Sequence, residues 1–528
     1  MGASASLPLG NELNADQQVK IYRQMVNEQA SLSAANTPPD QAYEKLVQKH
    51  SELVKLYSTT SFQCPKVRFG RTELQMPILT CGGMRQQQTW APGPDMTLEQ
   101  VNKECQENFE KIVARSMELG INHFETARAY GSSELQYGPI LKKYNRSDYI
   151  LQTKVPPKAD PAEFRKVLET SFATLQMDQG NPNEYLDLFG FHGINKPEHL
   201  EWIRREGGCM EVINEYKEKG LIKHVGFSTH GMTPTIVEAI ETGLFDYVNL
   251  HYHFVGSYTA TGTGPLGGNL AAVQAARKQD MGVFIISPSD KGGALYEPPQ
   301  ALVNACAPLT PIAFNELFLW SSDESQAPIH TLVVGAARPA DFDEHMQAAM
   351  LYEQRKEIVA PIEAKLSQLV ADKFGPDFKA TWFEGLPDAY QNPEGLPIGN
   401  LYWLYWIIVA WGMYGYALKR YTPLEGSLKG WDDSKSPEEN QKAFSWVPGV
   451  GYRPEREAQL REILKDHPRG EVVVEAIKAL HSWMTAGGCL ARGEKPSPAQ
   501  GPGSVDINPA EWVTAYDLQP QLPFPERK

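Results

Sequence analysis

Paired cysteines are missing from this sequence. Its 528 residues contain six cysteines, and no two of them stand in a CxxC arrangement. This pattern argues against zinc ribbons, cysteine-ligated iron–sulfur clusters and thioredoxin-type redox centres, because those sites need closely spaced thiolates. A disulfide scaffold is typical of small secreted domains and does not suit a chain of this length. We therefore expect a protein of the reducing, cytoplasmic compartment.

Long basic runs are also lacking. The chain has 50 lysine and arginine residues against 64 aspartate and glutamate residues, which gives a net charge of −14. An acidic chain repels phosphate backbones, so we expect no nucleic-acid partner, while a local basic pocket for one small phosphorylated ligand stays open. The 41% apolar and 22% charged residues are typical of a globular protein, and the length suits two or three domains.

A secretory signal and a convincing membrane span are absent too. The N-terminus has no apolar run, but Gly2 and Ser6 fit the pattern for N-myristoylation, which gives weak and reversible membrane attachment. The uncharged stretch 401–418 barely reaches the length of a spanning helix, and seven of its residues are Trp or Tyr, which prefer interfaces or pockets. We expect a buried helix that docks the C-terminal region. Peripheral membrane association through Gly2 or 401–418 is the alternative.

Three regions follow one another along the chain. Residues 1–60 predict a helical extension, and residues 356–528 predict a mainly helical region with proline- and glycine-rich connections. Between them, in 61–355, short apolar strands alternate with amphipathic helices, which favours a (β/α)8 TIM barrel over an open doubly wound sheet. The predicted fold is therefore α/β, a barrel with an added region at each end. The eight expected strands are 78–81, 122–126, 149–154, 186–192, 224–228, 247–252, 282–287 and 331–335.

Polar side chains stand at the ends of the second, third and fourth expected strands, and barrel chemistry occurs at these ends. Glu125 and Tyr130 follow the second strand, Lys154 ends the third and His192 ends the fourth. A nearby ammonium ion stabilises a phenolate and lowers the pKa of the phenol, while a carboxylate holds the ammonium in place. A histidine can donate a hydrogen bond to a developing oxyanion. Such a set suits protonation of a carbonyl oxygen while hydride arrives at carbon.

Six fragments in 66–350 resemble, in the same order, those of the aldo-keto reductase family. The resemblance implies a metal-free, NADP(H)-dependent oxidoreductase that reduces an aldehyde or ketone to an alcohol, with NAD(H) left open. Tyr130 would then be the general acid, Lys154 its pKa-lowering partner and His192 the residue that orients the carbonyl. Glu125 would pair with Lys154. The fragments are 69–74, 120–131 (GINHFETARAYG), 151–154, 187–192 (DLFGFH), 225–228 and 333–339.

The same resemblance implies residues that bind the cofactor. Ser228 and Asn249 resemble side chains that hold the nicotinamide carboxamide. The loop 287–293 resembles one that closes over the pyrophosphate, where backbone N–H groups and one lysine suit phosphate. The expected cofactor residues are Ser228, Thr229, Asn249, Ser287, Ser289, Lys291, Gly292, Gly335, Ala336, Arg338, Asp341 and Glu344.

Several positions depart from the family's pattern. Glu125 stands where the family has aspartate, Thr229 where many members have asparagine, and Ile286 where many stack an aromatic ring on the nicotinamide. Asp341 lies near a position often held by an arginine that grips the 2′-phosphate, a task that Lys291, Arg338 or His345 could take over. These departures keep a second hypothesis open, namely a nucleotide-binding regulatory or scaffold protein with this fold and little turnover.

Two further patterns occur in the sequence. The C-terminal region resembles the tail of a bacterial aldo-keto reductase subgroup that carries a ferredoxin-like module, but every cluster cysteine is missing. His251 and His253 would share one face of the sixth strand and could serve a metal hydrolase. Such an enzyme needs further histidines and carboxylates at other strand ends, and Glu125 is the only evident candidate.

Overall fold

The computed structural model describes most of the chain. Gly2 and the remainder of 1–20 lie outside the described residues, so the myristoylation pattern stays a prediction. Between 21 and 50 the described residues are mostly helical. The main described part is 63–485, except 93–95, 178–179, 182–183, 257–268, 322–328, 443 and 445–446.

Eight parallel strands close into a barrel, which confirms the predicted (β/α)8 fold. The strands follow the chain around the barrel, and β10 closes it by pairing with both β9 and β3. A short antiparallel pair, β1 (Lys66–Arg68) and β2 (Gln75–Pro77), precedes the barrel. The barrel strands are β3 (Leu79–Gly82), β4 (His123–Glu125), β5 (Ile150–Val155), β6 (Leu186–His192), β7 (Ile222–Ser228), β8 (Tyr247–Leu250), β9 (Gly282–Ile286) and β10 (Thr331–Gly335).

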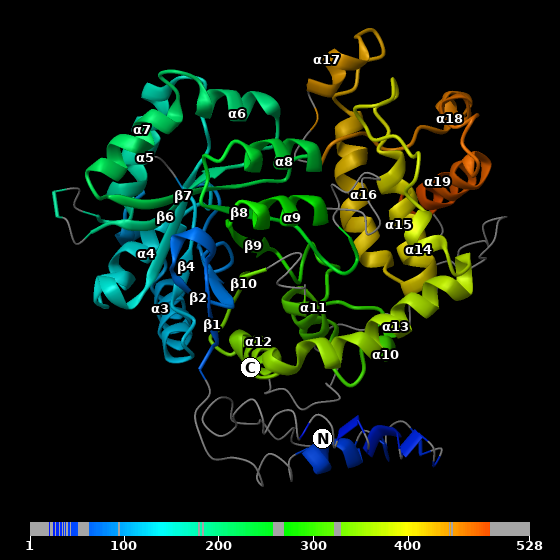
Figure 1. The fold of residues 1–528 in the computed structure, drawn as a ribbon, viewed down its shortest axis with the longest axis horizontal. Helices are drawn as coiled ribbons and strands as arrows, with labels where there is room; N and C mark the ends of the chain where they lie inside the picture. Colours follow the sequence, from blue (N-terminus) through cyan, green and yellow to red (C-terminus); the bar gives the residue numbers. More distant parts are fainter. Residues whose placement is uncertain are drawn as a thin grey trace.

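Helices surround the barrel (Figure 1), and several of them bury an apolar side. In α3, for example, the Asn102 side chain accepts from the amide of Cys105 at the N-terminus, and Phe109, Ile112 and Val113 are buried on the inner side. The helices that follow barrel strands are α3 (Lys103–Glu118), α4 (Ser133–Leu141), α5 (Pro161–Thr174), α6 (Pro197–Arg204), α7 (Cys209–Glu218), α8 (Thr233–Glu241), α9 (Leu270–Lys278), α10 (Gln300–Cys306), α11 (Pro311–Ser321) and α12 (Asp341–Met350).

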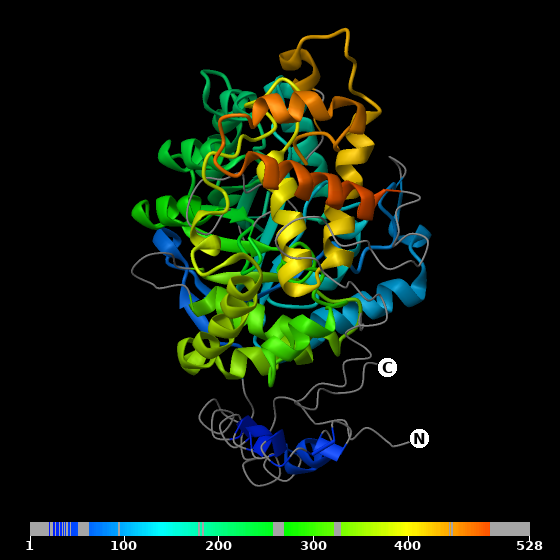
Figure 2. The same ribbon diagram turned by 90° about the vertical axis from the view of Figure 1, so that its right-hand side faces the viewer.

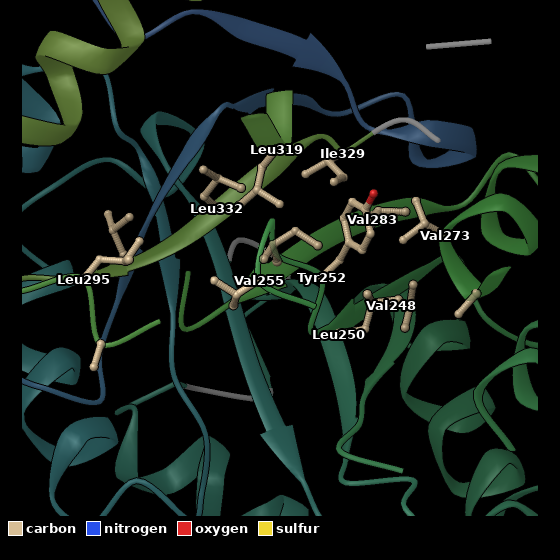
Figure 3. Close-up of a cluster of buried hydrophobic side chains, with 14 of the residues drawn as sticks. Val248, Leu250, Tyr252, Val255, Val273, Val283, Leu295, Leu319, Ile329 and Leu332 are labelled. Carbon is tan, nitrogen blue, oxygen red and sulfur yellow. The ribbon is translucent and has the colours of Figure 1, made fainter. Parts of the chain in front are cut away.

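The apolar core extends from the barrel strands outward to these helices. Figure 3 shows part of it, with Val248 and Leu250 of β8 and Val283 of β9 among the clustered side chains. Tyr252 and Val255, which follow β8, belong to the same cluster. The core therefore continues into the loop beyond the end of β8, where the C-terminal region meets the barrel.

The C-terminal region is helical, as predicted, and lies to the right of the barrel in Figure 1. Figure 2 shows its helices from that side. Within it, α15 packs against both α16 and α19. Its helices are α13 (Arg355–Phe374), α14 (Phe378–Thr381), α15 (Ile398–Trp411), α16 (Tyr414–Leu428), α17 (Pro437–Lys442), α18 (Glu457–Ile463) and α19 (Gly470–Met484). Its likeness to a ferredoxin-like module stays a prediction.

The aromatic stretch 401–418 is not one helix. It covers the end of α15 and the start of α16, which are separated at Gly412. Gly412 has φ 72° in the left-handed region, where glycine ends a helix without the steric cost of a Cβ. Every residue of α15 is buried. In the described part of the chain no single helix has the length and apolar composition needed to cross a membrane; α10 and α11 meet that test only as a pair bent by 54°.

Side chains of α15 and α16 dock the C-terminal region onto the ends of barrel strands. The indole nitrogen Nε1 of Trp403 donates to the carbonyl oxygen of Val255, after β8, at 2.6 Å. The hydroxyl of Tyr416 donates to the carbonyl oxygen of Lys291, after β9, at 2.5 Å. The docking that the aromatic stretch predicted is thus present, and it involves two loops at the mouth of the barrel.

We expect the Trp403 bond to contribute measurably to stability. Trp403→Phe leaves the buried carbonyl of Val255 without its donor, so the free energy of unfolding should fall by about 1–3 kcal/mol. Trp406→Phe is the matched control, because its Nε1 finds no partner among the described residues. Urea denaturation of the full chain measures both. Equal losses in the two variants would show that ring packing, rather than the hydrogen bond, matters at Trp403.

Candidate active site

A cavity of about 560 Å³ opens at the carboxyl ends of the barrel strands. Its size is within the range of about 300–1,000 Å³ common for small-molecule and cofactor sites. Ten of the sixteen expected site residues line it, together with residues that the sequence did not single out. The expected residues at its wall are Glu125, Tyr130, Lys154, His192, Ser228, Ser287, Ser289, Lys291, Gly335 and Asp341.

A buried ion pair lies at the inner end of this cavity. Lys154 is the last residue but one of β5, with only 1% of its surface exposed, and its Nζ donates to Glu125 Oε1 and, at 2.7 Å, to the carbonyl oxygen of Thr126. Gly190 faces Lys154 across the β5–β6 ladder. A Cβ on Gly190 would lie 2.8 Å from Lys154 Cγ, so the glycine leaves room for the lysine stem. The predicted pairing of Glu125 with Lys154 is therefore present.

Tyr130 lies beside this pair, but not as predicted. Its hydroxyl donates to Glu125 Oε1 at 3.3 Å, while Lys154 Nζ lies 4.7 Å from the centre of its ring. Burial raises the pKa of Tyr130 well above its usual value, and the negative charge and hydrogen bond of Glu125 add to the rise. The net shift is therefore upward, opposite to the lowering that we expected from Lys154, because burial and the Glu125 carboxylate dominate it.

His192 is a neutral hydrogen-bonding group in this site. Its ring stands edge-on to Tyr130, with 5.5 Å between ring centres. Burial, together with the charges of Lys154 and Lys291, lowers its pKa to about 3. Its Nδ1 is buried and has no hydrogen-bond partner in the part of the chain that the structure describes. A neutral imidazole has one N–H donor, so His192 can donate to a ligand oxygen without carrying charge.

The loop after β9 brings a lysine to the cavity and uses part of its backbone in hydrogen bonds within the loop. The amides of 291–295 donate to carbonyl oxygens of Ser287, Ser289 and Asp290, so they are not directed at a phosphate group as expected. Burial and the nearby Arg420 lower the pKa of Lys291 to about 7, against the opposing effect of Asp290. The charge of this loop therefore changes within the physiological pH range.

The expected nicotinamide-binding residues are only partly at the cavity. Ser228 lines it. The hydroxyl of Thr229 instead donates to the carbonyl oxygen of Ile194 at 2.7 Å and accepts from the amide of Gly231. Asn249 is fully buried among the strands, where its Oδ1 accepts from Gln152, and it is not among the described residues that line the cavity.

The residues expected near the 2′-phosphate are engaged with one another. Asp341, in the first turn of α12, accepts from the amides of Ala337 and Arg338, and its carboxylate lies 3.0 Å from the Arg338 guanidinium. Glu344 accepts from the Thr310 hydroxyl at 2.9 Å. Gly335, Asp341 and His345 are among the described residues at the cavity wall, whereas Gly292, Ala336, Arg338 and Glu344 are not.

Sequence reasoning missed several cavity residues, among them two with side chains that can carry charge. Arg85 follows β3, and His230 lies two residues beyond Ser228. The only signal was their position just after a strand end. His230 Nδ1 lies 2.8 Å from His251 Nε2, and the two rings stack.

The predicted strand face with His251 and His253 is wrong, because β8 ends at Leu250. Across the described residues, no three histidine, cysteine, aspartate or glutamate side chains gather as metal ligands would.

Comparison with known proteins yields one family match. Residues 79–256, which run from β3 to the loop after β8, match the family model described as "Aldo/keto reductase family". Solved structures similar to this chain include an aldo-keto reductase from Bombyx mori in complex with NADP (16% identity, 58% of this chain and 94% of that one, TM-score 0.37). Others are aldo-keto reductases from Klebsiella pneumoniae in complex with NADPH (17%, 59% and 96%, 0.39) and from Brucella melitensis (18%, 58% and 100%, 0.39).

Shortening the carboxylate should change the acidity of the phenol. In Glu125→Asp the carboxylate lies one methylene further from Tyr130, so the pKa of Tyr130 should fall by about 1 unit or more as the negative charge recedes. Carbon-13 NMR of labelled tyrosine, with Tyr130→Phe to assign the resonance, measures this pKa. A pKa that stays or rises would contradict the placement of Glu125 between the two groups.

Proposed function

We propose that the protein is an oxidoreductase that reduces an aldehyde or ketone to an alcohol. A nicotinamide dinucleotide would be the hydride donor and Tyr130 the acid. The premise is that residues 79–256 belong to the aldo-keto reductase family. The main observation behind this proposal is that four side chains lie together at one end of a cavity of about 560 Å³. They are Tyr130, Glu125, Lys154 and His192. A phenol, a neutral imidazole and a buried ion pair in contact form a proton-donating site.

The residues at the cavity fit a dinucleotide. The volume is adequate, Lys291 gives a cation at the loop after β9, and His192 Nδ1 lacks a partner among the described residues. When bound, the dinucleotide supplies the hydride. The chain supplies everything else: neutral His192 donates a hydrogen bond to the carbonyl oxygen, and Tyr130 gives that oxygen its proton. The ion pair with Lys154 holds the Glu125 side chain in place beside the phenol.

Both NADPH and NADH are proposed as cofactors. The Arg338 guanidinium pairs with Asp341 at 3.0 Å, and Asp343 and Glu344 add acidic side chains in the same first turn of α12. A helix N-terminus attracts anions, but these carboxylates oppose a 2′-phosphate. Arg85, at the cavity wall, offers positive charge from another side. The balance gives neither cofactor a clear electrostatic advantage.

The rival function is a nucleotide-binding regulatory or scaffold protein. One observation favours it: the raised pKa of Tyr130 makes the phenol a weaker acid than the family resemblance implies. A slow proton donor would limit turnover and leave binding unaffected. Turnover therefore decides between the two functions.

Tyr130→Phe should separate binding from catalysis. We expect saturable binding of NADPH or NADH, followed by nicotinamide fluorescence, and Tyr130-dependent oxidation of the cofactor with a panel of aldehydes and ketones. Because a positioned acid contributes about a hundredfold or more to rate, the variant should lose at least that factor in kcat and keep its cofactor Kd. Binding without turnover in the wild type would instead support the rival, and absence of binding by either nucleotide would refute both.

Cofactor affinity should depend on the charge of Lys291. With a pKa lowered to about 7, the ammonium is present below pH 7 and is lost as the pH rises above it. The Kd for NADH, which has no titrating 2′-phosphate, should therefore rise between pH 7 and 9, by up to about tenfold per unit. His192 and His253 do not interfere, because burial lowers the pKa of each to about 3, far below this window.

Two substitutions control this pH profile. Lys291→Met removes the charge and should give weak, pH-independent binding from pH 6 to 9, whereas Lys291→Arg keeps a permanent charge and should give tighter, equally flat binding. Isothermal titration calorimetry at each pH measures the Kd. A Lys291→Met variant with the wild-type slope would show that another group titrates.

A further inference from the structure

A second cavity, of about 240 Å³, lies between the loop after β8 and the helices of the C-terminal region. No described residue lines both this cavity and the active-site cavity, so the two are separate spaces. We call it the aromatic cavity. Its lining residues are Tyr252, His253, Phe254, Val255, Phe314, Phe318, Ser321, Glu363, Leu366, Lys379, Trp382, Trp406 and Trp411.

Three indole rings dominate the walls of the aromatic cavity. The ring centres of Trp406 and Trp411 are 5.1 Å apart, and those of Trp382 and Trp406 are 5.8 Å apart. Phe254 joins them, 5.8 Å from Trp411. Such walls favour a flat aromatic ligand. An apolar cavity of about 150 Å³ already holds a benzene ring, so this volume admits a ring with a small substituent.

One wall group requires a polar partner. Trp406 is 3% exposed, and its Nε1 has no hydrogen-bond partner among the described residues. The neighbouring Trp411 differs, because its Nε1 donates to the carbonyl oxygen of Leu366 at 3.1 Å. A buried donor without an acceptor is costly, and a ligand oxygen in the cavity would remove that cost. The ligand therefore carries a hydrogen-bond acceptor.

His253 adds a second polar group. It is 2% exposed, and neither of its ring nitrogens finds a partner in the described part of the chain. Burial lowers its pKa to about 3, so the ring is neutral and has one donor and one acceptor. The ring lies beside the loop after β9, because a Cβ on Gly292 would lie 3.0 Å from its Nδ1 and the charges that act on its pKa are those of Lys291, Arg420 and Asp290. The hydrogen bond to a ligand in the cavity is therefore assigned to Trp406 alone.

The charges at the aromatic cavity balance. Glu363 and Lys379 both line it. Burial raises the pKa of Glu363 and lowers that of Lys379, and each charge opposes the shift of the other. With one group of each sign, neither an anion nor a cation is favoured. The ligand is therefore neutral.

From the ring-lined walls, the volume and the unpartnered indole nitrogen of Trp406, we propose that the aromatic cavity binds a small neutral phenol, with its ring against Trp382, Trp406 and Trp411 and its oxygen accepting from Trp406 Nε1. This site is separate from the barrel mouth, and it does not rest on the proposed reductase activity.

Phenol and toluene test the proposal, because they have the same size and shape and differ in the hydroxyl. Binding to the full-length chain is measured by isothermal titration calorimetry and by saturation-transfer NMR. We expect phenol to bind at one site. Trp406→Phe should weaken phenol about threefold to tenfold, the equivalent of one hydrogen bond, and leave toluene unchanged. Trp320→Phe is the matched control, since its indole Nε1 is also buried without a described partner but lies outside the cavity.

A second variant and two charged probes complete the test. Phe318→Trp adds volume at the cavity wall and should weaken both ligands, with thermal unfolding used to confirm that the variant is folded. Benzoate and benzylammonium should bind more weakly than phenol. Equal effects of Trp406→Phe on phenol and toluene, equal effects of Trp406→Phe and Trp320→Phe, or no saturable phenol binding would each overturn the proposal. Phenol binding that NADH displaces and Trp406→Phe leaves intact would place the site at the barrel mouth and overturn it as well.

Discussion

The buried ion pair between Glu125 and Lys154 is the constraint around which the barrel mouth is arranged. A lysine with 1% exposure can stay charged inside a barrel only if a carboxylate and further acceptors replace water. Glu125 and the carbonyl oxygen of Thr126 do so here. Gly190, on the neighbouring strand, gives the lysine stem its space. Loss of either charged partner would leave the other uncompensated, a defect that costs about 3–5 kcal/mol in buried pairs.

This pair also sets the properties of its neighbours. Because Glu125 accepts from both Lys154 and Tyr130, the phenol faces a carboxylate and its pKa rises. The positive charge of Lys154 meanwhile helps to keep His192 neutral. One extra methylene, relative to the aspartate expected from the family resemblance, thus alters the acidity of the tyrosine while the four side chains stay together.

The sequence predicted the barrel and the composition of its catalytic end well. All eight strands were found within a few residues, because buried parallel strands are continuous apolar runs between amphipathic helices. Glu125, Tyr130, Lys154 and His192 converge because carboxyl ends of parallel strands meet at one end of a barrel. Such reasoning places residues at one end of the barrel, but it does not say which groups their side chains contact there.

The failures of sequence reasoning follow from that limit. Asn249 points among the strands, the amides of 291–295 bond within their own loop, and β8 ends before His251. Each outcome depends on the direction of one backbone segment rather than on residue type. Gly412 divides the aromatic stretch into two helices. A single glycine in an apolar run does indicate a helix end, so this division could be read from the sequence.

The C-terminal region shapes the active-site cavity without supplying any of its described lining residues. Tyr416 of α16 donates to the carbonyl oxygen of Lys291, which fixes the loop after β9. Arg420, four residues and one helical turn further on, lies near enough to lower the pKa of the same lysine. One helix therefore sets both the position and the charge of the group that would meet an anion. Since Trp403 of α15 holds the loop after β8 in the same way, a change in how these helices pack would reach the barrel mouth through two loops at once.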